Sequence, residues 1–200
     1  MDRQTFLTHY NLHQYPDEHL TPFRFPDPAK AAVLVALRET DDQLEVILTR
    51  RAAHLRTHAN QISFPGGKID SGETVQEAAV REAWEEIRLS PDFIELRGEL
   101  PSFQTISGFE LFPVIGFVDP KATFEPQEDE VAEILVVPFQ HFLAHESHYT
   151  HNYKHGSHQY DLHFYPYKHY LIWGATAAVL HQLVLQVTKH DRYHPKLITL

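Results

Sequence analysis

The stretch from residue 66 to residue 89 constrains the fold more than any other part of the chain. Residues 66–73 are rich in glycine and predict a turn, and residues 74–89 predict one helix. Thr74 and Glu77 have the spacing of a capping box, in which each side chain bonds the backbone N–H of the other residue. The glycines let the backbone pass close to the helix and to a ligand. They are Gly66, Gly67 and Gly72.

Three acids, Glu82, Glu85 and Glu86, fall within an arc of about 100° on this helix. The opposite side predicts a core face made of Ala79, Val80, Ala83, Trp84 and Ile87. Like charges so close repel one another. A solvated acidic face is one interpretation. The other is a divalent cation site, because carboxylate oxygens are the ligands that hard cations prefer.

The spacing of this stretch resembles the Nudix box. Gly67 is followed after five residues by Glu73, and after seven more residues by the sequence Arg81-Glu82-Ala83-Trp84-Glu85-Glu86-Ile87-Arg88-Leu89. Arg88 stands where the family usually has glycine, and we expect the end of the helix to be affected, because glycine adopts the left-handed conformation without strain.

The Nudix resemblance implies an α/β (α+β) fold, an αβα sandwich around a mixed β-sheet. It implies hydrolysis of a nucleoside diphosphate linked to another group. The implied metal is Mg²⁺ or Mn²⁺, with Glu82, Glu85, Glu86 and the backbone carbonyl of Gly66 as ligands. Glu82 and Glu85 are the expected catalytic residues. Glu73 and Arg81 are expected to brace the loop on the helix, and Lys68 to contact phosphate or solvent.

The length and composition of the chain limit the classes of function that it can have. A length of 200 residues predicts one domain over 1–200, with an N-terminal arm at 1–30 and a core at 31–190. The net charge of −10 argues against a nucleic-acid surface. Cysteine is absent, and no apolar run has the length of a membrane span. We expect a cytoplasmic protein and leave its oligomeric state open.

Apolar runs and turn residues predict the other elements. Residues 31–37 and 44–49 predict a hairpin around Asp41-Asp42. Further strands are expected at 94–100, 112–118 and 134–137, and helices at 5–15, 138–143 and 172–189. Residues 16–28 are expected to be irregular, and Gly174 is expected to mark close packing of the last helix on the sheet.

Residues 50–65 are basic and precede the acidic helix. They form either a surface loop that balances charge or an anion-binding loop, since arginine suits bidentate contacts with phosphate. Segments 48–51, 58–61, 64–67, 103–109 and 172–180 resemble the coenzyme A pyrophosphatase branch of the Nudix hydrolases. The expected substrate-binding residues are Arg50, Arg51, His58, Gln61 and Lys68. Asn60 replaces the glycine of that branch, and asparagine is the best other residue for a positive φ.

Three further groups have two interpretations each. In one interpretation, an outer metal ligand or a base comes from Glu128, Glu130 or Glu133. In the other, these acids are only solvated. Thr105 and Ser107 either bind a ligand or shape a turn. Residues 141–169 hold eight of the sixteen histidines and predict a long hairpin turning at Gly156-Ser157. Their spacing is irregular and no cysteine accompanies them, so we expect surface histidines rather than a zinc or copper site.

The favoured reaction is cleavage of coenzyme A or an acyl derivative into 4′-phosphopantetheine and adenosine 3′,5′-bisphosphate. The first alternative is another nucleoside diphosphate derivative, such as ADP-ribose or NADH. The second is a Nudix-fold binding or regulatory module without turnover. Intact acids at Glu82, Glu85 and Glu86 favour an enzyme over such a module.

Overall fold

A mixed β-sheet forms the centre of the molecule. The computed structural model describes residues 1–13, 24–155, 158–188 and 196–198. The main sheet has the strand order β3-β2-β1-β7-β5, with β4 also paired to β1, β6 to β7 and β8 to β2. β1 and β7 are parallel, and the other pairs are antiparallel. The strand bounds are β1 (Ala29–Thr40), β2 (Gln43–Arg51), β3 (Ile62–Ser63), β4 (Gly66–Lys68), β5 (Ile94–Glu99), β6 (Phe103–Gln104), β7 (Phe109–Val118) and β8 (Val131–Pro138).

The predicted hairpin of β1 and β2 is confirmed. Thr40 pairs with Gln43, and Asp41 and Asp42 form the turn with φ values of 50° and 57°. Two successive positive φ values suit a two-residue hairpin loop, and aspartate tolerates this conformation better than most residues.

Alternation along β1 places apolar side chains on both faces of the sheet. Ala32, Leu34 and Ala36 belong to the core under one helix, and Val35 and Leu37 belong to the core on the opposite face. A strand buried on both faces is a continuous apolar run, as observed here.

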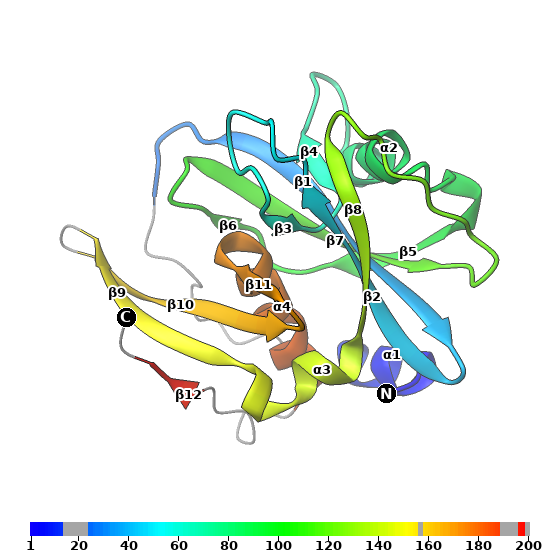
Figure 1. The fold of residues 1–200 in the computed structure, drawn as a ribbon. Helices are drawn as coiled ribbons and strands as arrows, with labels where there is room; N and C mark the ends of the chain where they lie inside the picture. The colour runs from blue at the N-terminus through cyan, green and yellow to red at the C-terminus, as the bar shows by residue number, and fades with distance from the viewer. Residues whose placement is uncertain (14–23, 156–157, 189–195, 199–200) are drawn as a thin grey trace.

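Helices cover both faces of this sheet (Figure 1). α2 (Val75–Ile87) packs on one face, and α1 (Arg3–Leu12), α3 (Phe139–Leu143) and α4 (Gly174–Val187) share the core of the other. Short 3₁₀ turns, η1 (Pro91–Phe93) and η2 (His145–Ser147), complete the described helical segments. The predicted αβα sandwich is therefore confirmed. Among the described residues, no helix has both the length and the apolar character needed to cross a membrane.

A second sheet, of which only the hairpin was expected, lies on the outer side of α4 (Figure 1). Its order is β11-β10-β9-β12, and β12 runs parallel to β9. The bounds are β9 (Tyr149–His155), β10 (His158–Tyr167), β11 (Tyr170–Trp173) and β12 (Lys196–Leu197). The predicted turn at Gly156-Ser157 lies outside the described residues, as do the last two residues of the helix predicted at 5–15 and most of the irregular segment 16–28.

The expectation of surface histidines is wrong for two residues of segment 141–169. His148 is fully buried and His163 is 9% exposed. The His148 ring stacks on Tyr165, with 4.3 Å between centroids, and its Nε2 lies 3.0 Å from Nδ1 of His163. Burial lowers the pKa of both imidazoles to about 3, so both are neutral at pH 7. An irregular spacing in sequence thus gives a compact cluster in space.

The glycine-rich turn predicted over residues 66–73 is present only at residues 71–72, and the prediction is wrong for Gly66 and Gly67. Both residues lie in β4, which pairs with β1 at Val33 and Ala32. A Cβ on Gly66 would lie 2.4 Å from the carbonyl oxygen of Ala32, so glycine is needed for close approach rather than for turning. Gly174 differs as well: no atom lies within 4 Å of an added Cβ, and its φ of +66° explains the residue instead.

α2 begins and ends as its sequence indicates. Thr74 and Glu77 form the predicted capping box. Arg88 ends the helix in the left-handed conformation, with φ 54° and ψ 26°, and its N–H donates to the Trp84 carbonyl at 3.0 Å. Arginine therefore adopts the conformation that glycine usually supplies, at a cost of about 1–2 kcal/mol.

The buried face of α2 is rotated from the predicted one. Ala79, Ala83 and Ile87 are fully buried as expected, but Trp84 is 45% exposed and Glu86 is 2% exposed. Small alanines bring the helix close to the sheet, which leaves no room for an indole there. The three carboxylates are therefore not all on a solvated side, because Glu86 points into the protein.

Replacing Ile87 with alanine tests this packing. Because Ile87 is fully buried between α2 and the sheet, Ile87→Ala should lower the free energy of unfolding by about 2–5 kcal/mol. Trp84→Ala on the exposed flank is the control and should cost clearly less. Chemical denaturation measures both, and a loss below about 0.5 kcal/mol for Ile87→Ala would contradict the packing.

Candidate active site

One guanidinium connects the acids of α2 to the strand beneath them. Arg81 Nε and Nη2 donate to the two carboxylate oxygens of Glu73 at 2.8 and 3.1 Å, and Nη2 also donates to the Lys68 carbonyl at 3.0 Å. Nη1 donates to Glu82 and to Glu85, both at 2.9 Å. The bond to Glu73 is the main reason that the pKa of Arg81 is raised and that of Glu73 lowered. Arg81 thus fixes β4 against the helix.

Glu86 is a carboxylate buried in the core-facing side of α2. Its Oε2 accepts a hydrogen bond from the Gly66 N–H at 3.3 Å, and its Oε1 lies 3.8 Å from Nη1 of Arg51. Loss of solvent, and then the charge of Glu82, raise the pKa of Glu86 to about 8. These two contacts therefore only partly offset the cost of burying this acid.

Glu82 lies between Glu86 and Arg81 on the same side of the helix. Its side chain is 15% exposed, and burial raises its pKa despite the bond from Arg81. An added Cβ on Gly67 would lie 2.4 Å from Glu82 Oε1, so the second glycine of β4 leaves the space that this carboxylate occupies. Glu85 is the most solvent-accessible of the three acids, at 54% exposure.

A fourth acid approaches from the loop before β8. The charge of Glu130 contributes to the raised pKa of both Glu82 and Glu86. Backbone bonds hold this loop in place: the Gln127 N–H donates to the Glu86 carbonyl at 2.8 Å, and the Ala52 N–H donates to the Glu130 carbonyl at 2.8 Å. Of the three acids considered in the sequence, Glu130 contributes its charge at Glu82 and Glu86, whereas Glu133 accepts a hydrogen bond from Arg50.

The two consecutive arginines of β2 point to different surroundings, as period-two alternation requires. Arg51 faces Glu86, and its buried Nε has no hydrogen-bond partner. Arg50 donates to Glu133 at 3.2 Å and to the Asn60 side chain at 3.1 Å. Tyr170, which sequence reasoning did not select, donates its hydroxyl to Glu133 at 2.7 Å. No local signal marks Tyr170, since it lies 37 residues from its partner.

The loop after β2 has the backbone shape expected for Asn60. Asn60 has φ 61°, and His58 also has a positive φ of 58°. His58 Nδ1 lies 2.8 Å from Oε1 of Gln61, so these two candidate residues contact each other. The Arg51 N–H donates to the Gln61 carbonyl at 3.0 Å, which closes the loop on the strand that carries the arginines.

Three other candidates have local roles in the described structure. Thr105 Oγ1 accepts from the Phe109 N–H at 3.2 Å and lies 2.9 Å from the Ser107 hydroxyl, so these side chains shape the turn between β6 and β7. The Lys68 side chain is exposed, with its ammonium 5.9 Å from the centre of the Phe109 ring.

The donor set fits a hard divalent cation. Glu82, Glu85, Glu86 and Glu130 supply carboxylate oxygens, the ligand type that Mg²⁺ and Mn²⁺ prefer. A cation would also oppose the two effects that raise the pKa of Glu86, namely burial and the neighbouring Glu82 charge. These acids could hold such a cation on this side of α2, beside β4.

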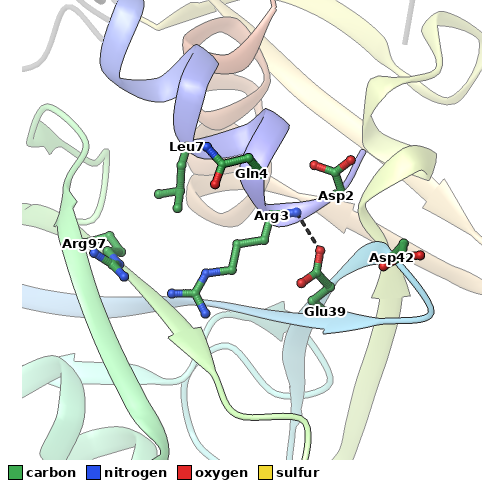
Figure 2. Close-up of a pocket in the computed structure, with 7 residues that line it drawn as sticks. All are labelled: Asp2, Arg3, Gln4, Leu7, Glu39, Asp42 and Arg97. Atoms are coloured by element: carbon green, nitrogen blue, oxygen red, sulfur yellow. Dashed lines mark hydrogen bonds between the residues drawn. The ribbon is translucent and has the colours of Figure 1, made fainter.

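A surface hollow of about 580 Å³ lies elsewhere (Figure 2). Arg3 and Glu39 line it, and the Arg3 N–H donates to Glu39 at 2.8 Å. Glu39 lies six residues along β1 from Val33, the partner of Gly66, a separation of roughly 20 Å on an extended strand. This hollow is therefore separate from the acids. Its described lining also includes Asp2, Gln4, Leu7, Asp42 and Arg97.

The two glycines of β4 give a matched test of the site. Gly67→Ala meets only the movable end of Glu82, so it should change stability by less than about 1 kcal/mol while lowering Mn²⁺ affinity by about 10-fold or more. Gly66→Ala meets the Ala32 carbonyl and the Val33 Cα, so it should instead lower stability by about 1–3 kcal/mol. Calorimetric Mn²⁺ titration and thermal unfolding measure the two effects. Unchanged Mn²⁺ binding in Gly67→Ala would place the cation elsewhere.

Sequence comparisons agree with this arrangement. Residues 28–158, more than half of the chain, match the family described as the NUDIX domain. The uncharacterized Nudix hydrolase NudL of Pectobacterium atrosepticum is 34% identical, over 92% of this chain and 93% of that protein. NudL of Citrobacter koseri is 39% identical, over 71% of this chain and 74% of that protein.

Solved structures show the same fold. A MutT/nudix family protein from Enterococcus faecalis aligns with a TM-score of 0.52 and 19% identity, over 94% of this chain and 74% of that chain. The Nudix hydrolase RenU from M. smegmatis aligns with a TM-score of 0.50 and 24% identity, over 62% and 81% of the two chains. The family match, the relatives and the arrangement of Glu73, Arg81 and the α2 acids lead to one conclusion: the chain belongs to the Nudix hydrolase family.

Proposed function

We propose that this chain is a pyrophosphohydrolase that uses Mg²⁺ or Mn²⁺ to cleave coenzyme A or an acyl derivative of it. The observation that carries the proposal is the position of Arg51. A partly buried guanidinium faces the buried carboxylate of Glu86, so a cationic group and the proposed metal ligands line the same place. A diphosphate needs both kinds of partner, because its oxygens bind cations and guanidinium donors.

Each side chain has a distinct task in this proposal. When bound, the metal neutralises phosphate oxygens and lowers the pKa of water. Glu82 and Glu86, with the Gly66 carbonyl, would hold the ion. Glu85 is the exposed acid and takes the proton of the attacking water as the bond between phosphorus and the bridging oxygen breaks. Arg81 keeps Glu82 and Glu85 in position.

The coenzyme A assignment rests on the sequence segments around these residues. Segments 48–51, 58–61, 64–67 and 103–109 resemble the coenzyme A branch, and Asn60 supplies the positive φ that glycine gives in that branch. Arg50, His58, Gln61 and Lys68 are the proposed substrate contacts besides Arg51. A small nucleotide-derived substrate and a cytoplasmic location belong to the same proposal.

A hydrolysis screen separates this substrate from the alternatives. The purified chain would be assayed with Mg²⁺ or Mn²⁺ on coenzyme A, NADH and ADP-ribose. Cleavage of NADH or ADP-ribose alone would move the chain to another Nudix substrate class. Binding of these compounds without turnover would support a regulatory module and overturn the enzymatic proposal.

The proposed ligands can be neutralised without a change of size. Glu82→Gln and Glu86→Gln should each lower kcat by about 100-fold or more, because loss of a metal ligand removes several kcal/mol of charge stabilisation. Glu125→Gln, an exposed acid of the loop before β8, is the control and should keep the wild-type rate. Rates of both ligand variants equal to wild type at saturating Mg²⁺ would exclude this ligand assignment.

The 3′-phosphate of coenzyme A provides a second test. A charge-assisted contact to it is worth roughly 1.5–3 kcal/mol, so coenzyme A should exceed its 3′-dephospho form in kcat/KM by about 10- to 150-fold. Arg51→Ala should lower kcat/KM for both substrates equally, because Arg51 lies at the metal ligands. Arg50→Ala should reduce the preference itself, because Arg50 lies toward Asn60 at the edge of the loop. Equal efficiency of wild type on both substrates would remove the coenzyme A assignment.

A further inference from the structure

Three histidines from three separate segments of the chain meet where α4 faces the second sheet. His148 follows η2 and precedes β9, His163 lies in β10, and His181 lies in α4. Each offers a ring nitrogen, and these nitrogens all lie within 4.8 Å of one another. Two of the rings are buried, and the His181 ring is half-buried.

The spacing of the nitrogens is close to that of a metal site. His148 Nε2 and His163 Nδ1 are 3.0 Å apart. Two ligands of tetrahedral zinc, each about 2.0–2.1 Å from the ion, are separated by roughly 3.4 Å. An ion between these two rings therefore requires the nitrogens to move apart by only a few tenths of an ångström.

The His181 ring must move further than the other two rings to bind the ion. His163 and His181 stack with 4.1 Å between centroids and an interplanar angle of 27°, so ion binding exchanges this contact for a bond from a rotated His181 ring. Rotation is feasible because His181 is the least buried member of the three. This rotation also leaves a position for a fourth ligand of the ion, on the side of His181.

The chemistry of the cluster differs from that of the α2 acids. Imidazole nitrogen suits zinc, nickel and copper, whereas carboxylate oxygen suits Mg²⁺ and Mn²⁺. The ligating form of histidine is the neutral ring, and both His148 and His163 are buried.

We propose that His148, His163 and His181 form a second metal site, which binds Zn²⁺ or a similar transition-metal ion with water as its fourth ligand. The ion cross-links β10 and the segment before β9 to α4. Its role is structural, because it ties the second sheet to α4. α4 is joined in turn to the main sheet, where Thr176 donates a hydrogen bond to the Ile62 carbonyl of β3 at 2.9 Å.

Cobalt(II) substitution tests the site directly. The full chain carrying Glu82→Gln and Glu86→Gln, which removes two oxygen ligands at α2, would be titrated with Co²⁺ in excess Mg²⁺. We expect one equivalent to bind with the intense visible bands of tetrahedral nitrogen coordination. Addition of Zn²⁺ should displace the cobalt, and Zn²⁺ at about 100-fold above its Kd should raise Tm by roughly 5–10 °C.

Matched histidine variants complete the experiment. His163→Gln and His181→Gln should lose the cobalt bands and the Zn²⁺-dependent rise in Tm, while His169→Gln, an exposed histidine of the turn between β10 and β11, should keep both. His181→Gln changes the least buried member and guards against a variant that fails to fold, which circular dichroism would detect. Absent cobalt bands, or bands that persist in His181→Gln, would show that the cluster is only a packed set of imidazoles.

Discussion

The bidentate pair of Arg81 and Glu73 is the interaction on which the rest of the site depends. Planar guanidinium and carboxylate groups matched by two hydrogen bonds have little freedom to rotate. The remaining Arg81 donors reach the Lys68 carbonyl, Glu82 and Glu85, so one side chain connects β4 to three acids. Since β4 also pairs with β1, the centre of the main sheet, rather than a loop, fixes the position of the acids.

Features that depend on a few neighbouring residues could be predicted from the sequence. The capping box of Thr74 and Glu77, the two-residue turn at Asp41-Asp42 and the positive φ of Asn60 are each decided by local backbone and side-chain chemistry. The rotation of α2 could not be predicted in the same way. Whether Trp84 or Glu86 is buried depends on how closely the helix approaches the sheet, which is a tertiary property.

The candidate site also combines features set by neighbouring residues with features set by tertiary packing. The α2 acids belong to one helical arc, so their proximity is visible in the sequence, and period two explains why Arg50 and Arg51 diverge. Glu130 and Tyr170 join through contacts between distant segments that leave no periodic trace. The histidines show most clearly what sequence spacing cannot predict. Spacing can identify ligands on one helix or hairpin, but His148, His163 and His181 come from three separate segments of the chain.

The second sheet therefore contributes to the geometry of Arg50 and the loop after β2 as well as to the core. Tyr170 of β11 bonds Glu133, which bonds Arg50, and Thr176 of α4 bonds the carbonyl of Ile62 at the end of that loop. A shift of β11 and α4 relative to the main sheet would be transmitted to Arg50 through two hydrogen bonds. These hydrogen bonds do not involve the α2 acids, which Arg81 and β4 hold in place. The position of Arg50 therefore depends on the C-terminal part of the chain, whereas the position of the α2 acids depends on Arg81 and β4.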